Sequence, residues 1–298
     1  MRSLELRMHL PVATVPESGV RCALLAPRLS LASCVRGHIV RSTAGLALGP
    51  EQRYNHFPAS PLCAICWLFQ GGATVVQRGD QAICEVTPRI SLIGPHSVPV
   101  VSHNPGPVEA LMVALTPAAV EALSGVPVSS LVNRVVPLEE VFGAAWGTMA
   151  QEVLRATDDA RRIALFEDFL EPRWELVRDG TVLRADRFHY WVENLALRAA
   201  QSGVGVGMRQ MERRIKQWAG QPLRDLRRME RAEETFFRAM ASHQRGSLDW
   251  AEMAVDCGYA DQAHLCRDVR RNTGHSPTDL LAAIEQEESF WMYRLRDQ

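Results

Sequence analysis

The chain has 298 residues, of which 47% are hydrophobic and 22% are charged, and its formal net charge is -1. This length suffices for two domains with separate cores, and the near-neutral charge does not by itself indicate nucleic-acid binding. The seven cysteines lack the even framework of a secreted disulfide protein. Because no apolar run long enough for a membrane span and no secretory signal pattern occurs, we expect a cytoplasmic protein with no membrane partner.

The first half of the chain is predicted to be rich in strands. Residues 1–35 have no clean period. Short apolar runs typical of strands then occupy 38–48, 62–70, 74–77, 89–94, 97–102 and 108–115. Turn sequences such as GPEQ, PASP and NPGP separate them. Short strands with this spacing predict a small antiparallel barrel or sandwich.

After Thr116 the pattern becomes helical. Pro117 suits a first helical position and Gly125 a helix end, which predicts a short helix between them. A longer helix is predicted from Pro137 to about Val153, because apolar residues recur there at spacings of three and four. Another helix is predicted from Asp158 to about Phe169, and residues 178–181 are the expected domain boundary.

Beyond this boundary the sequence predicts a helical domain. An amphipathic helix is expected over 184–201, with a break at 202–207. The next helix is expected over 208–218, with Met211 and Ile215 facing inward. A long connecting helix then follows at 222–241, with Pro222 at its start.

Residues 248–280 predict two helices joined by a tight turn. In the first helix, four apolar residues from Trp250 to Cys257 fall on one face, and Asp249 is placed as an N-cap. Gly258 supplies the turn, and Asp261 caps a second helix whose residues Leu265 and Val269 face inward. The opposite face carries Gln262, Arg267, Arg270 and Arg271. Arg and Gln match base edges and phosphates, and a helix fits the major groove, so this is a candidate DNA-reading unit.

These residues resemble the second helix-turn-helix of the AraC/XylS family of bacterial transcription regulators. The resemblance covers an aromatic residue at Tyr259, the Asp261–Gln262 pair, His264, and the basic positions Arg267, Arg270 and Arg271. It continues through Gly274, Ser276 and Pro277. Cys266, Val269 and Leu280 depart from the family pattern in ways that affect packing. Asp268 places an acid among the arginines, where we expect it to weaken phosphate contacts locally.

The resemblance implies an α+β architecture with three parts. These are a cupin-like antiparallel β sensing domain at 1–116, a helical connector or dimerisation region at 117–180, and a DNA-binding domain with two helix-turn-helix units at 181–298. The first unit places Arg209, Glu212, Arg213 and Lys216 on DNA. The second places residues of its recognition helix there, namely Gln262, Ala263, His264, Cys266, Arg267, Arg270 and Arg271.

Metal and redox sites have weaker support in the sequence. His38, His56, His96 and His103 lie in the predicted β domain but lack the His-x-His pair that a metal-binding cupin uses. Cys63 and Cys66 form a CxxC pair, which within a strand points to opposite faces. No metal and no cofactor are therefore expected.

Ile65, Trp67 and Phe69 alternate along one predicted strand. They either line an effector pocket or belong to the core, and the core is the commoner place for such residues.

The sequence as a whole predicts a non-enzymatic, sequence-specific transcription regulator. Its expected partners are two adjacent major-groove segments of double-stranded DNA, a small-molecule effector, RNA polymerase and a second copy of the chain. The alternative is a metal-dependent or ligand-binding cupin protein whose C-terminal helices mediate protein contacts.

Overall fold

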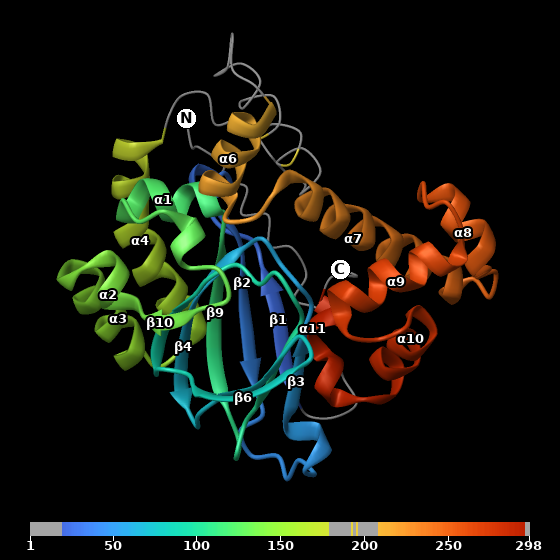
Figure 1. Ribbon diagram of the computed structural model, residues 1–298. Helices are drawn as coiled ribbons and strands as arrows, with labels where there is room; N and C mark the ends of the chain where they lie inside the picture. Colours follow the sequence, from blue (N-terminus) through green and yellow to red (C-terminus); the bar gives the residue numbers. More distant parts are fainter. Residues whose placement is uncertain (1–19, 179–191, 193–194, 196–207, 296–298) are drawn as a thin grey trace, which may run out of the picture.

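The structure is a computed structural model that describes residues 20–178, 192, 195 and 208–295. Two antiparallel sheets form the first half of the chain, called here the β domain (Figure 1). The six-stranded sheet has the order β1 (Arg21–Leu25), β2 (Val35–Ser42), β9 (Glu109–Leu115), β4 (Cys63–Gln70), β7 (Ile90–Ile93), β10 (Val135–Pro137). The four-stranded sheet has the order β3 (Tyr54–Phe57), β8 (Val100–His103), β5 (Thr74–Arg78), β6 (Gln81–Val86). The predicted antiparallel β fold is confirmed.

The six-stranded sheet is covered on both faces, which explains why β4 is apolar throughout. Ile65 and Trp67 are fully buried in the core against the helices, whereas Cys66 and Leu68 belong to an apolar cluster on the other face. Side chains alternate across a strand, so both faces of a doubly covered strand are apolar. Of the two readings for Ile65 and Trp67, the structure shows the core.

Four helices pack on the outer face of this sheet: α1 (Pro117–Ser124), α2 (Leu138–Phe142), α3 (Ala144–Arg155) and α4 (Asp159–Val177). The predicted caps of α1 are present, with the Thr116 hydroxyl accepting from the Ala119 amide and Gly125 in the left-handed region. The single helix predicted over 137–153 is wrong, because Gly143 adopts a positive φ of 82° and separates α2 from α3. The helix predicted to end near Phe169 continues to Val177.

The C-terminal half is helical. It contains α6 (Met208–Ala219), α7 (Leu223–Gln244), α8 (Trp250–Asp256), α9 (Gln262–Thr273), α10 (Pro277–Gln286) and α11 (Trp291–Arg294). The predicted α6, α7, α8 and α9 are confirmed within three residues at their ends. Of the helix predicted at 184–201, only Val192 and Leu195 are described; both are helical and buried. The predicted break at 202–207 and the boundary residues 179–181 lie outside the described residues.

The strands β1, β3, β6 and β10 were not predicted. β6 has no buried residue, and β3 and β10 are short, so none of these three has a strong period-two pattern. β10 pairs with β7, so one strand of the six-stranded sheet comes from the region predicted as the connector.

Candidate nucleic-acid interface

The second helix-turn-helix unit, α8 with α9, is held together by an apolar core. Met253, Ala254 and Cys257 from α8 pack with Leu265 and Val269 from α9. Tyr259, which follows the turn at Gly258, is buried between α7 and α9, where its hydroxyl lies 3.4 Å from the Thr235 hydroxyl. The turn requires a left-handed residue, and Gly258 has φ 72°.

Both helices of this unit begin at a side-chain cap. The Asp249 carboxylate accepts from the Ala251 and Glu252 amides, and the Asp261 carboxylate accepts from the His264 amide at 2.6 Å. Such caps satisfy amides that a helix start leaves without partners. They fix where α9 begins, and so which of its side chains face outward.

The outward face of α9 carries five of the seven α9 residues predicted to contact DNA. Gln262, Ala263, Arg267, Arg270 and Arg271 are exposed. No hydrogen bond or ion pair fixes the guanidinium of Arg267 within the described part of the chain. A basic helix face with one amide near its N-terminus can donate to base edges and phosphates.

Three other polar or soft side chains of α9 lie at the edge of this face. His264 is half-buried, with its ring edge-on to Tyr259 at 5.2 Å between centroids, and Cys266 is also half-buried. Asp268 points to α7, where its carboxylate pairs with the Arg231 guanidinium at 3.0 Å. The acid expected to weaken phosphate contacts is therefore engaged inside the domain.

The first unit presents its predicted contacts on α6. Arg209, Glu212, Arg213 and Lys216 are all exposed, while Ile215 is buried. Ile215 packs with Val192, Leu195, Ala219 and Leu226 in a small separate core. The turn after α6 packs beside the short 3-10 helix Val128–Ser130. A Cβ atom at Gly220 in this turn would lie 2.7 Å from the Val132 side chain, so the turn leaves no room for a larger residue.

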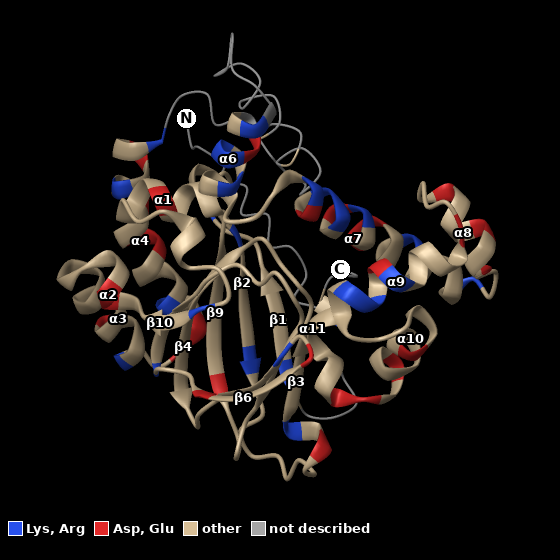
Figure 2. Ribbon diagram, in the orientation of Figure 1, with Lys and Arg blue, Asp and Glu red and all other residues tan. Residues whose placement is uncertain are grey.

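The long helix α7 joins the two units. Basic residues lie on α6, α7 and α9, where acidic residues are interspersed among them, whereas the charged residues of α8 and α10 are all acidic (Figure 2).

The second unit is docked on the β domain, which the sequence did not predict. The Ala59 amide donates to the Asn272 carbonyl in the last turn of α9 at 2.7 Å. His56 of β3 stacks on Phe290 with ring centroids 4.2 Å apart. The rings of His56 and His275 form a T-shaped contact with centroids 5.4 Å apart. The β domain therefore contacts the recognition helix itself.

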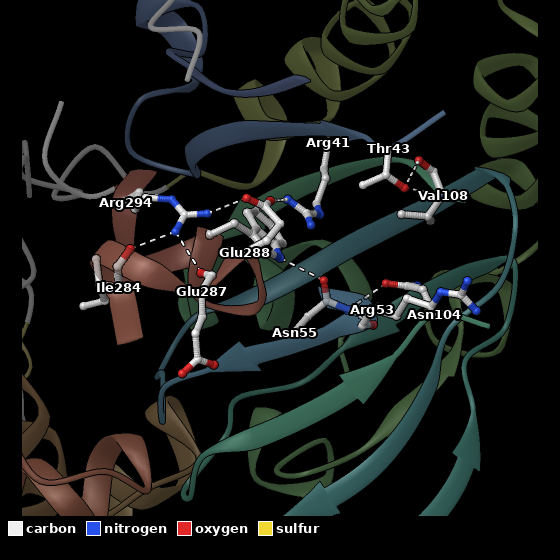
Figure 3. A network of polar contacts seen from close by, with 11 residues as sticks. Arg41, Thr43, Arg53, Asn55, Asn104, Val108, Ile284, Glu287, Glu288 and Arg294 are labelled. Atoms are coloured by element: carbon white, nitrogen blue, oxygen red, sulfur yellow. Dashed lines mark hydrogen bonds and ion pairs between the residues drawn. The ribbon is translucent and has the colours of Figure 1, made fainter. Parts of the chain in front are cut away.

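Residues 287–295, called here the C-terminal segment, form the other half of this contact. The Glu288 carboxylate pairs with Arg41 of β2 at 3.0 Å and with Arg294 at 2.8 Å. The Trp291 indole donates to the Asn55 side-chain oxygen at 2.8 Å, and the Arg41 guanidinium lies 4.4 Å from the centre of its ring. Figure 3 shows this network between the two parts of the chain.

The histidine contact predicts that docking weakens in acid. Burial, followed by the nearby His275, lowers the pKa of His56 to about 4, while His275 also has a lowered pKa, chiefly through burial. The docked form therefore favours neutral rings, so its stability relative to the undocked form falls as the pH drops from about 6.5 toward 4. Hydrogen exchange of the Ala59 amide, corrected for its intrinsic rate, should speed up across this range.

A His56→Phe variant tests this prediction, because it keeps the stacking and removes the titration. The acid dependence of Ala59 exchange should shrink in this variant. It should persist in the control variant His243→Gln, because the imidazole of His243 pairs with Glu285 on the surface. An equal acid response in wild type and His56→Phe would contradict the assignment.

The residues weighed for metal binding are dispersed. His38 bonds Glu167 at 2.9 Å, His56 faces the second unit, and His103 lies against Tyr54. In the part of the chain that the structure describes, no group of three or more His, Cys, Asp or Glu side chains is placed to hold a metal. Cys63 and Cys66 are both free and point to opposite faces, as predicted, and burial raises the pKa of both thiols to about 12.

Comparison with known proteins places the C-terminal region in a family. Residues 202–283 match the helix-turn-helix domain family. No curated protein matches the chain by sequence. Among solved structures, the chain is similar to ToxT from Vibrio cholerae O395, with 12% identity and a TM-score of 0.39 over 78% of this chain and 95% of that one.

A second similar structure is unsaturated fatty acid bound wild-type ToxT from Vibrio cholerae strain SCE256. It has 10% identity and a TM-score of 0.37 over 77% of this chain and 93% of that one.

The matched model and the two helical units define the class of the C-terminal region, which is a helix-turn-helix domain. More narrowly, this domain is an AraC-type helix-turn-helix domain, as the sequence resemblance implied. The N-terminal antiparallel β region precedes it. No helix in the described ranges is long and apolar enough to span a membrane.

Proposed function

We propose that this protein regulates transcription by reading two successive major-groove segments with α6 and α9. The observation that supports this most directly is the exposed face of α9, whose start is fixed by the Asp261 cap and whose inner face is fixed by Leu265 and Val269. Gln262 and Arg267 read base edges from α9, and Arg209, Glu212 and Arg213 do so from α6. Lys216, Arg270 and Arg271 contact phosphates. No chemical reaction is part of this proposal.

His264, Ala263 and Cys266 have subsidiary roles in this proposal. Ala263 is exposed beside Gln262 and offers a methyl contact, whereas His264 and Cys266 are half-buried and approach DNA at the edge of the face. Arg270 and Arg271 lie in the last turn of α9, where a phosphate contact positions the helix without reading sequence.

The division of the chain is also a proposal. Residues 1–116 form the sensing domain, 117–180 the connector and 181–298 the DNA-binding domain. Support comes from the separate cores of the β region and of the second unit. An effector acts through the β domain, and a homodimer and a contact with RNA polymerase remain predictions. The protein functions in the cytoplasm, where its DNA is.

A binding selection tests the DNA-reading proposal. The full chain is incubated with a pool of random duplex DNA at moderate salt, and the retained DNA is sequenced. Enrichment of an asymmetric site with two blocks about one helical turn apart is the expected result. No retained DNA, even at low salt, would contradict it.

The variant Arg267→Ala should bind the selected site about 1–3 kcal/mol more weakly and lose preference at one base pair, because a bidentate Arg contact discriminates by this amount. The readout is a titration against the site and its single-base variants. Arg238→Ala is the matched control, since Arg238 lies on α7, where it pairs with Glu234 and donates to the Asp256 carbonyl. Unchanged affinity and base preference in Arg267→Ala would show that α9 is misplaced on DNA.

A further inference from the structure

A cavity of about 370 Å³ lies between the two sheets of the β domain. Its size falls within the range of small-molecule sites, roughly 300–1,000 Å³. The six-stranded sheet contributes the side chains opposite to its core face, such as Ala64, Cys66 and Met112, and the four-stranded sheet contributes Val75 and Val100. The walls are predominantly apolar, so the site favours an apolar occupant.

Most polar groups along this cavity are uncharged, and its charged groups are of both signs. The Asn55 side-chain amide donates to Asn104 at 2.6 Å and to the Ser102 hydroxyl at 3.3 Å. Arg41, which also lines the cavity, is paired with Glu288. Arg36 and Glu233 line it with opposite charges.

His96 also lines the wall, beside the thiols of Cys63 and Cys66, which burial keeps neutral. Burial, followed by the charge of Arg78, lowers the pKa of His96 to about 4, so its imidazole is neutral near pH 7. A neutral imidazole can donate or accept one hydrogen bond. A charged ligand would lose its hydration here without gaining an unengaged counter-ion from Arg41, which disfavours it.

One wall of the cavity belongs to the C-terminal segment. Trp291, Met292 and Leu295 line it together with Ile39 and Phe57 of the β domain. A ligand in the cavity therefore touches both parts of the chain at once, and part of its contact is lost when the segment leaves.

The cavity is also connected to the recognition helix by β3. Asn55 and Phe57 face the cavity, whereas His56 on the opposite face stacks on Phe290. The strand continues into Pro58, which lines the cavity, and Ala59, which donates to the Asn272 carbonyl of α9. Ser60 and His96 exchange backbone hydrogen bonds beside this contact.

We infer that this cavity binds an uncharged, largely apolar molecule with one hydrogen-bonding group, and that the bound molecule strengthens the docking of the second helix-turn-helix unit on the β domain. The inference rests on the proposed function only for its consequence on DNA binding. The ligand is expected to strengthen docking and not to weaken it, because a ligand that contacts both the β domain and the C-terminal segment binds the docked form more tightly. It therefore shifts the equilibrium between docked and undocked forms toward the docked form.

The test uses the full chain and the uncharged fluorophore N-phenyl-1-naphthylamine, whose emission rises in apolar surroundings. We expect saturable binding at one site per chain. 1-Decanol should displace the fluorophore at concentrations at least about tenfold lower than decanoate, which has the same chain length but a negative charge. Stronger displacement by decanoate would overturn the inference and assign an anionic ligand.

Two variants locate the site. Ala110→Phe fills the cavity and should abolish fluorophore binding, whereas Ala82→Phe, the same change at an exposed position of β6, should not. Met292→Ala changes only the wall from the C-terminal segment, so it preserves the sheets, and it should weaken binding at least about fivefold. Unchanged binding in both cavity variants would place the fluorophore elsewhere and overturn the inference.

Hydrogen exchange measures the coupling. Saturating 1-decanol should slow exchange of the amides of residues 287–295 and of Ala59, and unchanged or faster exchange would overturn the predicted sign. The result is independent of the DNA selection, since exchange and displacement are measured without DNA. Failure of the selection would therefore remove the proposed function and leave the cavity assignment standing.

Discussion

Replacing Glu288 by Ala is expected to release the C-terminal segment from the β domain. The change leaves Arg41, whose side chain is 4% exposed, without its ion-pair partner, and it also removes a partner of Arg294. Breaking a buried ion pair from one side costs about 3–5 kcal/mol, so most of the docking free energy should be lost. Burial already lowers the pKa of Arg41, and Glu288 offsets part of that effect. Hydrogen exchange of the Ala59 amide and of residues 287–295 should become much faster.

The control for this prediction is Glu285→Ala. Glu285 is exposed and pairs with His243 outside the docking contact, so its loss should change exchange little. The double variant Arg41→Met, Glu288→Leu should recover much of the protection, because replacing both charges with apolar groups avoids the unpaired cation. Full protection of Ala59 in the single variant Glu288→Ala would show that the ion pair does not hold the segment.

Replacing Trp67 by Ala should destabilise the β domain by about 3–5 kcal/mol, the range for a buried large aromatic residue. Trp67 is fully buried between the six-stranded sheet and the helices, and it meets the Phe166 ring edge-on at 5.8 Å. Its indole also donates to the Ala150 carbonyl of α3 at 3.1 Å. The variant loses apolar contact, leaves a cavity and removes this hydrogen bond. Chemical denaturation followed by circular dichroism measures the change in the free energy of unfolding.

Leu176→Ala is the matched surface control, since Leu176 is 86% exposed and its truncation should shift the free energy of unfolding by less than about 0.5 kcal/mol. The loss of unfolding free energy in Trp67→Phe should lie between those of Trp67→Ala and Leu176→Ala, because phenylalanine keeps an aromatic ring against Phe166 but cannot donate to the Ala150 carbonyl. Equal stability of Trp67→Ala and Leu176→Ala would contradict the core assignment.

The two helix-turn-helix units are held by different parts of the first half of the chain. The Asn272 carbonyl at the end of α9 and the C-terminal segment are both held by the β domain. The first unit rests separately on the helices around Val128–Ser130. The placement of α6 and α9 relative to each other therefore depends on α7 and on these contacts. If the proposed function and the proposed cavity ligand are both correct, a ligand that changes docking is expected to change DNA binding.

The sequence predicted the local structure of the second unit well because its signals are local. Asp249 and Asp261 cap helices through their own neighbouring amides, Gly258 permits a left-handed turn, and Leu265 and Val269 share a face through helical periodicity. The same reasoning predicted the exposed arginines of α9. It did not predict the partner of Asp268, because Arg231 lies on another helix.

The cavity and the docking contact were beyond the sequence for a physical reason. One face of β4 lines a cavity with Ala64, Cys66 and Leu68, and the other face packs Ile65 and Trp67 into the core. All five residues are apolar, so the sequence of β4 has no polar–apolar alternation that would distinguish the two faces. Arg41 and Glu288 are far apart in the sequence and carry no local pattern that pairs them. Local signals in the chain fix where helices start, turn and expose arginine. Long-range packing selects which apolar faces meet and which distant charges neutralise each other, because those energies depend on neighbours that the chain brings together by folding.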